Sequence, residues 1–230
     1  MSENTLSATT LTREQLEAGL NQLKEWYPAE AEKIDQHKET VLAHLTDGVE
    51  IPANDPIREE TAAPQALILQ APSDGISLSP CAKQAADFCA EAVTFMVTVA
   101  GCITASRFTT AYDRWIGSAF VETPAYVKKI TPLIKVFVEA DGKFAKAKAL
   151  APIAQEFWNT GIFKAGFDIL KSRSSYLDWL VDGTIAIGQI VVWVASEFIA
   201  AVAEFAVVIM SAVHLFLSGK EVCSVCFAKN

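Results

Sequence analysis

The stretch Gly183 to Ser218, GTIAIGQIVVWVASEFIAAVAEFAVVIMSAVHLFLS, decides the fold and carries only two carboxylates in 36 residues. As one helix at about 1.5 Å per residue it would be roughly 54 Å long, well beyond the ~30 Å hydrocarbon core of a bilayer. Two crossings joined near Ser196-Glu197 would each have about 17 residues, and neither glycine nor proline marks a turn there. The best single span would be Phe198 to Leu217. One straight crossing is therefore not the natural interpretation.

The polar residues of this stretch recur at steps of about seven: Gln189, Ser196, Glu197, Glu204, Ser211 and Ser218. On one continuous helix these steps place them in a narrow line. A helix buried in a bundle, with one thin seam that reaches water or a polar partner, has this pattern. The sequence therefore predicts a buried central helix in a soluble bundle. A carboxylate buried there must find a partner or take up a proton.

The chain begins with a predicted acidic helical hairpin, residues 1–48. Thr12 and Gln15 are spaced as a capping box, and leucines follow at helical spacing. Pro28 suits the first turn of a second helix, and Gly48 suits its end. Residues 49–79 are predicted to form a Pro-rich linker or arm. Their prolines exclude a long helix, and one extended piece is expected at Leu67–Leu69.

Residues 80–230 are predicted to form an apolar-cored helical bundle. Ser79 and Pro80 begin the first helix. The expected helices cover about 80–105, 107–120, 124–138 (kinked or broken at Pro132), 152–172 and the apolar stretch. The fold class is therefore all-α: a multi-helix bundle around a long apolar C-terminal helix, or helical hairpin, preceded by the acidic hairpin and the linker.

Charge is divided unevenly along the chain. Residues 1–60 hold 13 Asp/Glu and 5 Lys/Arg, so the whole formal charge of −8 lies in the first quarter. No basic face dominates, which argues against a nucleic-acid partner. A modest basic region, residues 128–173, is either the solvated face of helices or a surface for anionic lipid. Its candidate lipid contacts are Lys128, Lys129, Lys135, Lys143, Lys146 and Lys148.

No motif in the sequence indicates catalysis. The P-loop, the dinucleotide fingerprint, the zincin motif and the nucleophile elbow are all missing, so we expect no enzyme, no cofactor and no metal. Cys223 and Cys226 form a C-x-x-C pair and are a possible disulfide. A bridge from Cys81 or Cys89 to the tail is the alternative, and free thiols are the default.

A soluble bundle that hides so apolar a stretch is typical of proteins that convert from a soluble to a membrane-inserted form. Protonation of Glu197 and Glu204 in mild acid would reduce the cost of insertion, with His214 near the end of the stretch as a third titratable group. The plan resembles the pore-forming domains of colicins, in which a helical bundle surrounds an apolar hairpin. The resemblance is one of architecture. It implies a toxin-like or bacteriocin-like protein whose conditional partner is a lipid membrane.

Three other functions fit the same pattern, and one of them is an ordinary integral membrane protein with an acidic cytosolic head. The chain could be a carrier for a hydrophobic ligand, or an interaction or effector module whose apolar helix is covered by a protein partner or a second copy. The N-terminus has no basic and apolar leader. We therefore expect a cytosolic protein, or one exported without a cleavable signal, that becomes membrane-associated after conversion. The acidic hairpin could mask the basic region until the linker releases it.

Overall fold

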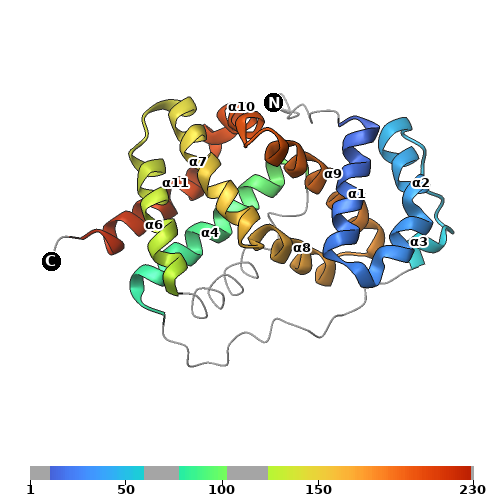
Figure 1. Cartoon of the computed structure of the whole chain (residues 1–230), viewed down its shortest axis with the longest axis horizontal. Helices are drawn as coiled ribbons and strands as arrows, with labels where there is room; N and C mark the ends of the chain where they lie inside the picture. Colours follow the sequence, from blue (N-terminus) through green and yellow to red (C-terminus); the bar gives the residue numbers. More distant parts are fainter. Residues whose placement is uncertain (1–10, 60–77, 103–123, 229–230) are drawn as a thin grey trace.

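The computed structural model describes residues 11–59, 78–102 and 124–228, and every regular element in these ranges is helical (Figure 1). The all-α class is therefore confirmed. The helix expected at 107–120 and the extended piece at Leu67–Leu69 lie outside the described residues. The elements are α1 (Arg13–Trp26), η1 (Pro28–Glu30), α2 (Ala31–Asp47), α3 (Pro56–Glu59), α4 (Pro80–Val99), α6 (Pro124–Glu139), α7 (Gly142–Asn159), α8 (Ile162–Arg173), α9 (Tyr176–Ala195), α10 (Ile199–Val208), η3 (Ile209–Ser211) and α11 (Val213–Cys226).

The helices form two groups that meet along α9 (Figure 1). At one end of the molecule, α1, α2, α3 and α8 pack against α9. At the other end, α4, α6, α7, α10 and α11 pack against one another. The acidic hairpin therefore lies directly on the first part of the apolar stretch, where it covers α9 with apolar side chains, among them Leu16, Leu20 and Leu23.

The capping box of the hairpin is confirmed. The Gln15 amide donates to Thr12 Oγ1 at 3.3 Å, and the Thr12 amide donates to Gln15 Oε1 at 2.8 Å. Gly48 ends α2 in the left-handed conformation, as its position in the sequence predicts. The hairpin is fixed to α8 by an ion pair between Glu30 and Lys171, whose charged atoms are 2.7 Å apart.

Two predicted helix limits and one predicted break are corrected. The helix α4 ends at Val99 rather than near residue 105, because Gly101 at φ 98° turns the chain and the Cys102 amide bonds back to the Val97 carbonyl at 3.0 Å. The helix α6 runs through Pro132 without a break. The next helix, α7, begins ten residues before Pro152 and includes it. Both prolines have exposed side chains, so their rings crowd no neighbouring helix.

The helix expected at 152–172 is divided in two. Gly161 adopts φ 75°, which ends α7 and starts α8 in a new direction. Aromatic residues continue on both sides of Gly161, and their pattern predicted a single helix. Ser79 and Ser175 both serve as N-caps of the helices that they precede, each accepting a hydrogen bond from the amide three residues on.

The apolar stretch is not one helix, so the predicted continuous helix is wrong. It breaks first after α9, at Ser196, where Glu197 and Phe198 adopt φ 51° and 63°. The Phe198 amide donates to the Trp193 carbonyl at 2.6 Å, and the Glu197 amide donates to the Val194 carbonyl at 3.0 Å. This is the hydrogen-bond pattern of a Schellman motif, formed here without glycine.

A second break separates α10 and η3 from α11. The two pieces, Ile199–Ser211 and Val213–Cys226, are bent by 90° relative to each other. Within the described residues, α9 is the one helix that is by itself long and apolar enough to cross a membrane, and the bent pair passes the same test together. A share of 61% of the apolar window in α9 is buried, so in this structure α9 is a core helix.

Candidate functional site

The turn after α9 brings two polar residues together. Gln189 Nε2 donates to Glu204 Oε1 at 2.7 Å, and Trp193 Nε1 donates to Glu204 Oε2 at 3.1 Å. Partial burial raises the pKa of Glu204, and the hydrogen bond from Trp193 opposes that shift. The sequence places Gln189 and Glu204 on one seam of a single helix. The structure instead joins them across a turn, where two donors hold one carboxylate.

The other two candidate trigger residues lie elsewhere. Glu197 is exposed in the turn itself, and His214 is exposed in the first turn of α11. Ser196, between α9 and α10, donates through its hydroxyl to the Trp193 carbonyl at 3.0 Å and accepts from the Ala200 amide at 3.1 Å. It therefore closes one helix and caps the next, which explains a break that no glycine marks.

The two breaks turn part of the apolar stretch outward. Five large apolar side chains of α10, η3 and α11 are more than half exposed; we call them the apolar face. They are Ile199 (73%), Val207 (76%), Met210 (65%), Val213 (57%) and Leu217 (51%). Ala203 is also exposed and continues the i, i+4 row on α10. Single exposed apolar residues are ordinary on a protein surface, whereas large contiguous apolar patches are typical of interaction sites.

This chain matches no known family, curated protein or solved structure. Its chemistry must be derived from its own residues.

Lysines lie beside one end of the apolar face. Lys146 is 4.3 Å from the ring centre of Phe216 in α11, and Lys220 is 4.6 Å from the same ring. These contacts place the first turns of α7 next to the start of α11. Burial lowers the pKa of Lys146; Asp141 opposes the shift and Lys220 adds to it. Its ammonium also donates to the Ala140 carbonyl at 2.9 Å, so Lys146 secures the end of α6.

The six lysines proposed as lipid contacts divide into two kinds. Three are committed to contacts within the chain: Lys146 as described, Lys129 with Glu156 at 2.7 Å, and Lys135 with Glu139 at 3.7 Å. The others, Lys128, Lys143 and Lys148, are exposed. Lys143 and Lys148 flank Phe144, which is 64% exposed in the first turn of α7.

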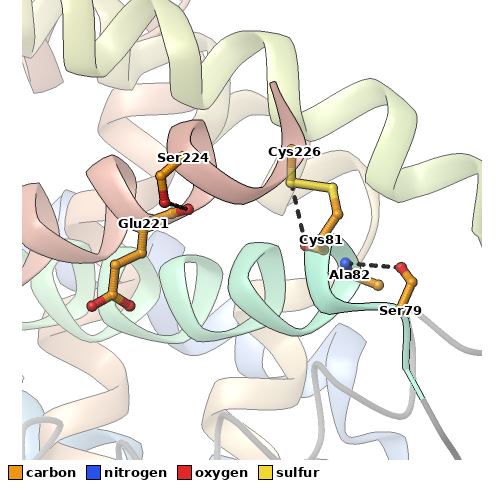
Figure 2. Close-up of a disulfide and its surroundings, with 6 residues drawn as sticks. All are labelled: Ser79, Cys81, Ala82, Glu221, Ser224 and Cys226. Atoms are coloured by element: carbon orange, nitrogen blue, oxygen red, sulfur yellow. Dashed lines mark hydrogen bonds between the residues drawn. A yellow bond between two sulfur atoms is a disulfide. The ribbon is translucent and has the colours of Figure 1, made fainter. Parts of the chain in front are cut away.

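The cysteine pairing corrects the C-x-x-C prediction. Cys226 is bonded to Cys81, which is 145 residues away (Figure 2). Cys223 is a free thiol. Of the pairings considered from the sequence, the bridge from Cys81 to the tail is therefore the one that forms. Figure 2 shows the end of α11 lying across the first turn of α4, where the bridge joins them. Cys89 is a buried thiol, and the buried Cys102 Sγ donates to Asp182 Oδ2 at 3.8 Å.

A cleft of about 320 Å³ opens between the end of α2, α3 and the start of α9. Its lining mixes charges of both signs with three aliphatic side chains: His44, Ile51, Arg58, Leu177, Asp178, Val181 and Asp182. In the part of the chain that the structure describes, no three His, Cys, Asp or Glu residues are grouped as metal ligands would be. The cleft suits a small polar molecule better than a lipid chain.

Proposed function

We propose that this protein is a membrane-active helical bundle, toxin-like or bacteriocin-like in its mode of action. It docks on an anionic lipid surface through the apolar face and then inserts apolar helices into the bilayer. The observation that carries the proposal is the apolar face itself. Along α10 and η3 the outward residues bear no charge, because the one carboxylate there, Glu204, is held inward by Gln189 and Trp193.

The size of the apolar face indicates how it would act. Full burial of one large apolar side chain contributes about 1.5–3 kcal/mol. Five side chains that are 51–76% exposed therefore offer roughly 6 kcal/mol in all. This free energy is similar to that with which a single acyl chain binds a membrane. Such binding is marginal and reversible, and stable anchoring needs a second membrane-binding feature, such as a group of basic residues. Lysines near an anionic surface contribute about 1 kcal/mol each. Lys143 and Lys148, which are exposed on α7, are the residues that we propose for that second feature.

The experiment is vesicle co-sedimentation of the full chain. We expect binding to vesicles with 30% anionic lipid, and weaker binding to neutral vesicles. Val207→Glu with Met210→Glu should lower the affinity at least tenfold, because two charges would have to enter the interface. The matched control is Val49→Glu, an exposed valine (53%) in the loop after α2, which should bind like the wild type. Absence of binding at both pH 7 and pH 5, or equal loss in both variants, would refute docking.

Insertion is tested separately by dye release. We expect release from anionic vesicles at about pH 5, where Glu204 takes up a proton more readily than an ordinary carboxyl group. Docking without release at either pH would leave a surface-binding protein and refute insertion. The full chain is required, because removal of the acidic hairpin would uncover the buried side of α9.

An interaction or effector module is the second candidate, since the same face could be covered by protein. Analytical ultracentrifugation distinguishes the two. This candidate would be favoured if the wild type forms a dimer and does not bind vesicles. The double substitution Val207→Glu with Met210→Glu should then dissociate the dimer. A carrier for a hydrophobic ligand has less support, because the described cleft is lined by charged residues.

A further inference from the structure

Three cysteines lie at the junction of α4 and α11. Cys81 is in the first turn of α4, Cys226 is the last residue of α11, and Cys223 lies three residues before it. Cys223 carries the free thiol of this group, and its side chain is partly exposed. A disulfide and a thiol one helical turn apart are the reactants of thiol–disulfide exchange.

The disulfide joins the last turn of α11 to the first turn of α4, and α11 also packs along its length against α4 and α6. Only three of its 14 residues are buried: Leu215, Gly219 and Val222. At Gly219 the helix lies so close to its neighbours that an added Cβ would be 2.8 Å from Val138 and 3.2 Å from Phe88. The exposed side of the same helix bears Val213 and Leu217 of the apolar face. Opening the bridge therefore releases the last turn of α11 from α4, in a helix whose exposed side contributes to the docking surface.

We propose that Cys223 is a resolving thiol that takes over Cys226 from Cys81, and so unfastens the end of α11 from α4. The effect on docking rests on the function proposed above, whereas the exchange itself does not.

The exchange balances without any oxidant or net reductant. The Cys223 thiolate attacks Cys226 Sγ and forms a Cys223–Cys226 bond, while the Cys81–Cys226 bond breaks and Cys81 leaves as a thiolate. The proton that Cys223 gives to water is matched by the one that Cys81 takes up. Residues three apart on a helix have Cβ atoms about 5–6 Å apart. A disulfide needs about 3.5–4.5 Å. The last turn of α11 must therefore tighten, and a helix end can do so.

In the folded bundle the thiol is restrained. Partial burial raises the pKa of Cys223; Glu139 of α6 adds to this rise and Lys135 of α6 opposes it. The C-terminal end of a helix also disfavours negative charge. Little thiolate is present at neutral pH, so the Cys81–Cys226 bridge persists until α11 shifts or a small thiol starts the exchange. When a small thiol starts the exchange, it attacks Cys226, forms a mixed disulfide there and releases Cys81. Cys223 then attacks Cys226 and releases the small thiol unchanged.

The test compares the full-length wild type with Cys223→Ser, which keeps the Cys81–Cys226 bridge. Both are treated with reduced glutathione without lipid, and the free thiols are trapped and mapped by mass spectrometry. We expect Cys81 to be released at least tenfold faster in the wild type, with a Cys223–Cys226 disulfide as the product. In Cys223→Ser the mixed disulfide should close back onto Cys81. Equal rates, or a product without the Cys223–Cys226 bond, would overturn the proposal.

A second variant tests whether the pair can form at all. In Cys81→Ser, oxidation with diamide should join Cys223 to Cys226, and both thiols remaining free would also overturn the exchange. Vesicle binding is then measured for the wild type before and after exchange, with increased binding expected after it. An exchange that proceeds in a protein that never binds vesicles would refute the proposed function and leave the thiol assignment standing.

Discussion

Gly19 of α1 lies directly against the backbone of α9. A Cβ added there would overlap the Thr184 carbonyl oxygen and would lie 2.8 Å from the Gly188 amide nitrogen. Both neighbours are backbone atoms of a buried helix, so neither can turn aside as a side chain would. Gly19→Ala must therefore separate the two helices, and the packing of Leu16, Leu20 and Leu23 against α9 is loosened with them.

The expected change in the free energy of unfolding is the sum of two opposing effects. Overpacking a close contact costs about 1–3 kcal/mol or somewhat more. Replacing a helical glycine by alanine recovers about 1 kcal/mol of helix propensity. The upper part of the first range applies to Gly19, because the clash is with backbone. We therefore expect Gly19→Ala to lower the free energy of unfolding by about 2 kcal/mol.

Gly183 of α9 provides the matched control. A Cβ there would lie 3.5 Å from the two methyl groups of Leu23, which is ordinary van der Waals contact. Gly183→Ala should therefore be neutral, or stabilising by up to about 1 kcal/mol. The assay is urea unfolding of both variants followed by far-UV circular dichroism, with the disulfide intact. If Gly19→Ala proves as stable as Gly183→Ala, the close approach of α1 and α9 is refuted.

Three further predictions concern charge and backbone conformation. Lys171→Ala leaves Glu30 partly buried without its partner and should cost about 3 kcal/mol in urea unfolding; the loss should be smaller when Glu30→Ala is added, and an additive double variant would contradict the pairing. Glu204 has a raised pKa in the folded state, so its ionisation opposes folding above that pKa and the penalty disappears as pH falls. Glu204→Gln should therefore be more stable than the wild type at pH 7, with the advantage gone below about pH 4; a pH-independent difference would argue against this. Glu197→Gly should raise the free energy of unfolding by about 0.5–1 kcal/mol, because it removes a side chain from a left-handed residue; a lower melting temperature would contradict the assigned turn.

Signals that act within a few residues could be read from the sequence. The capping box at Thr12, the serine cap at Ser79 and the stop at Gly48 all form as predicted, because each depends on hydrogen bonds within one turn. The helical class follows from the same local patterns.

Features that depend on distant partners could not be read in this way. The turn at Glu197 and Phe198 lacks the glycine that such turns usually contain, and the surrounding bundle holds it in place. The exposure of Val207 follows from that turn, so a pattern that implied burial was misleading. The partner of Cys226 is 145 residues away, and spacing cannot select it. Lys171, one of eight lysines in a basic region, is buried where it meets Glu30 and the rings of Tyr27 and Trp179.

The bridge between Cys81 and Cys226 has a topological consequence. It closes the chain from α4 to α11 into a covalent ring, and leaves the hairpin of α1 and α2 outside that ring. Force applied to the two ends of the oxidised chain can extend only the residues before Cys81 and the few after Cys226. About 80 residues at roughly 3.3–3.6 Å each set that limit. After exchange onto Cys223 the ring shrinks to one helical turn, and nearly the whole chain can be drawn out.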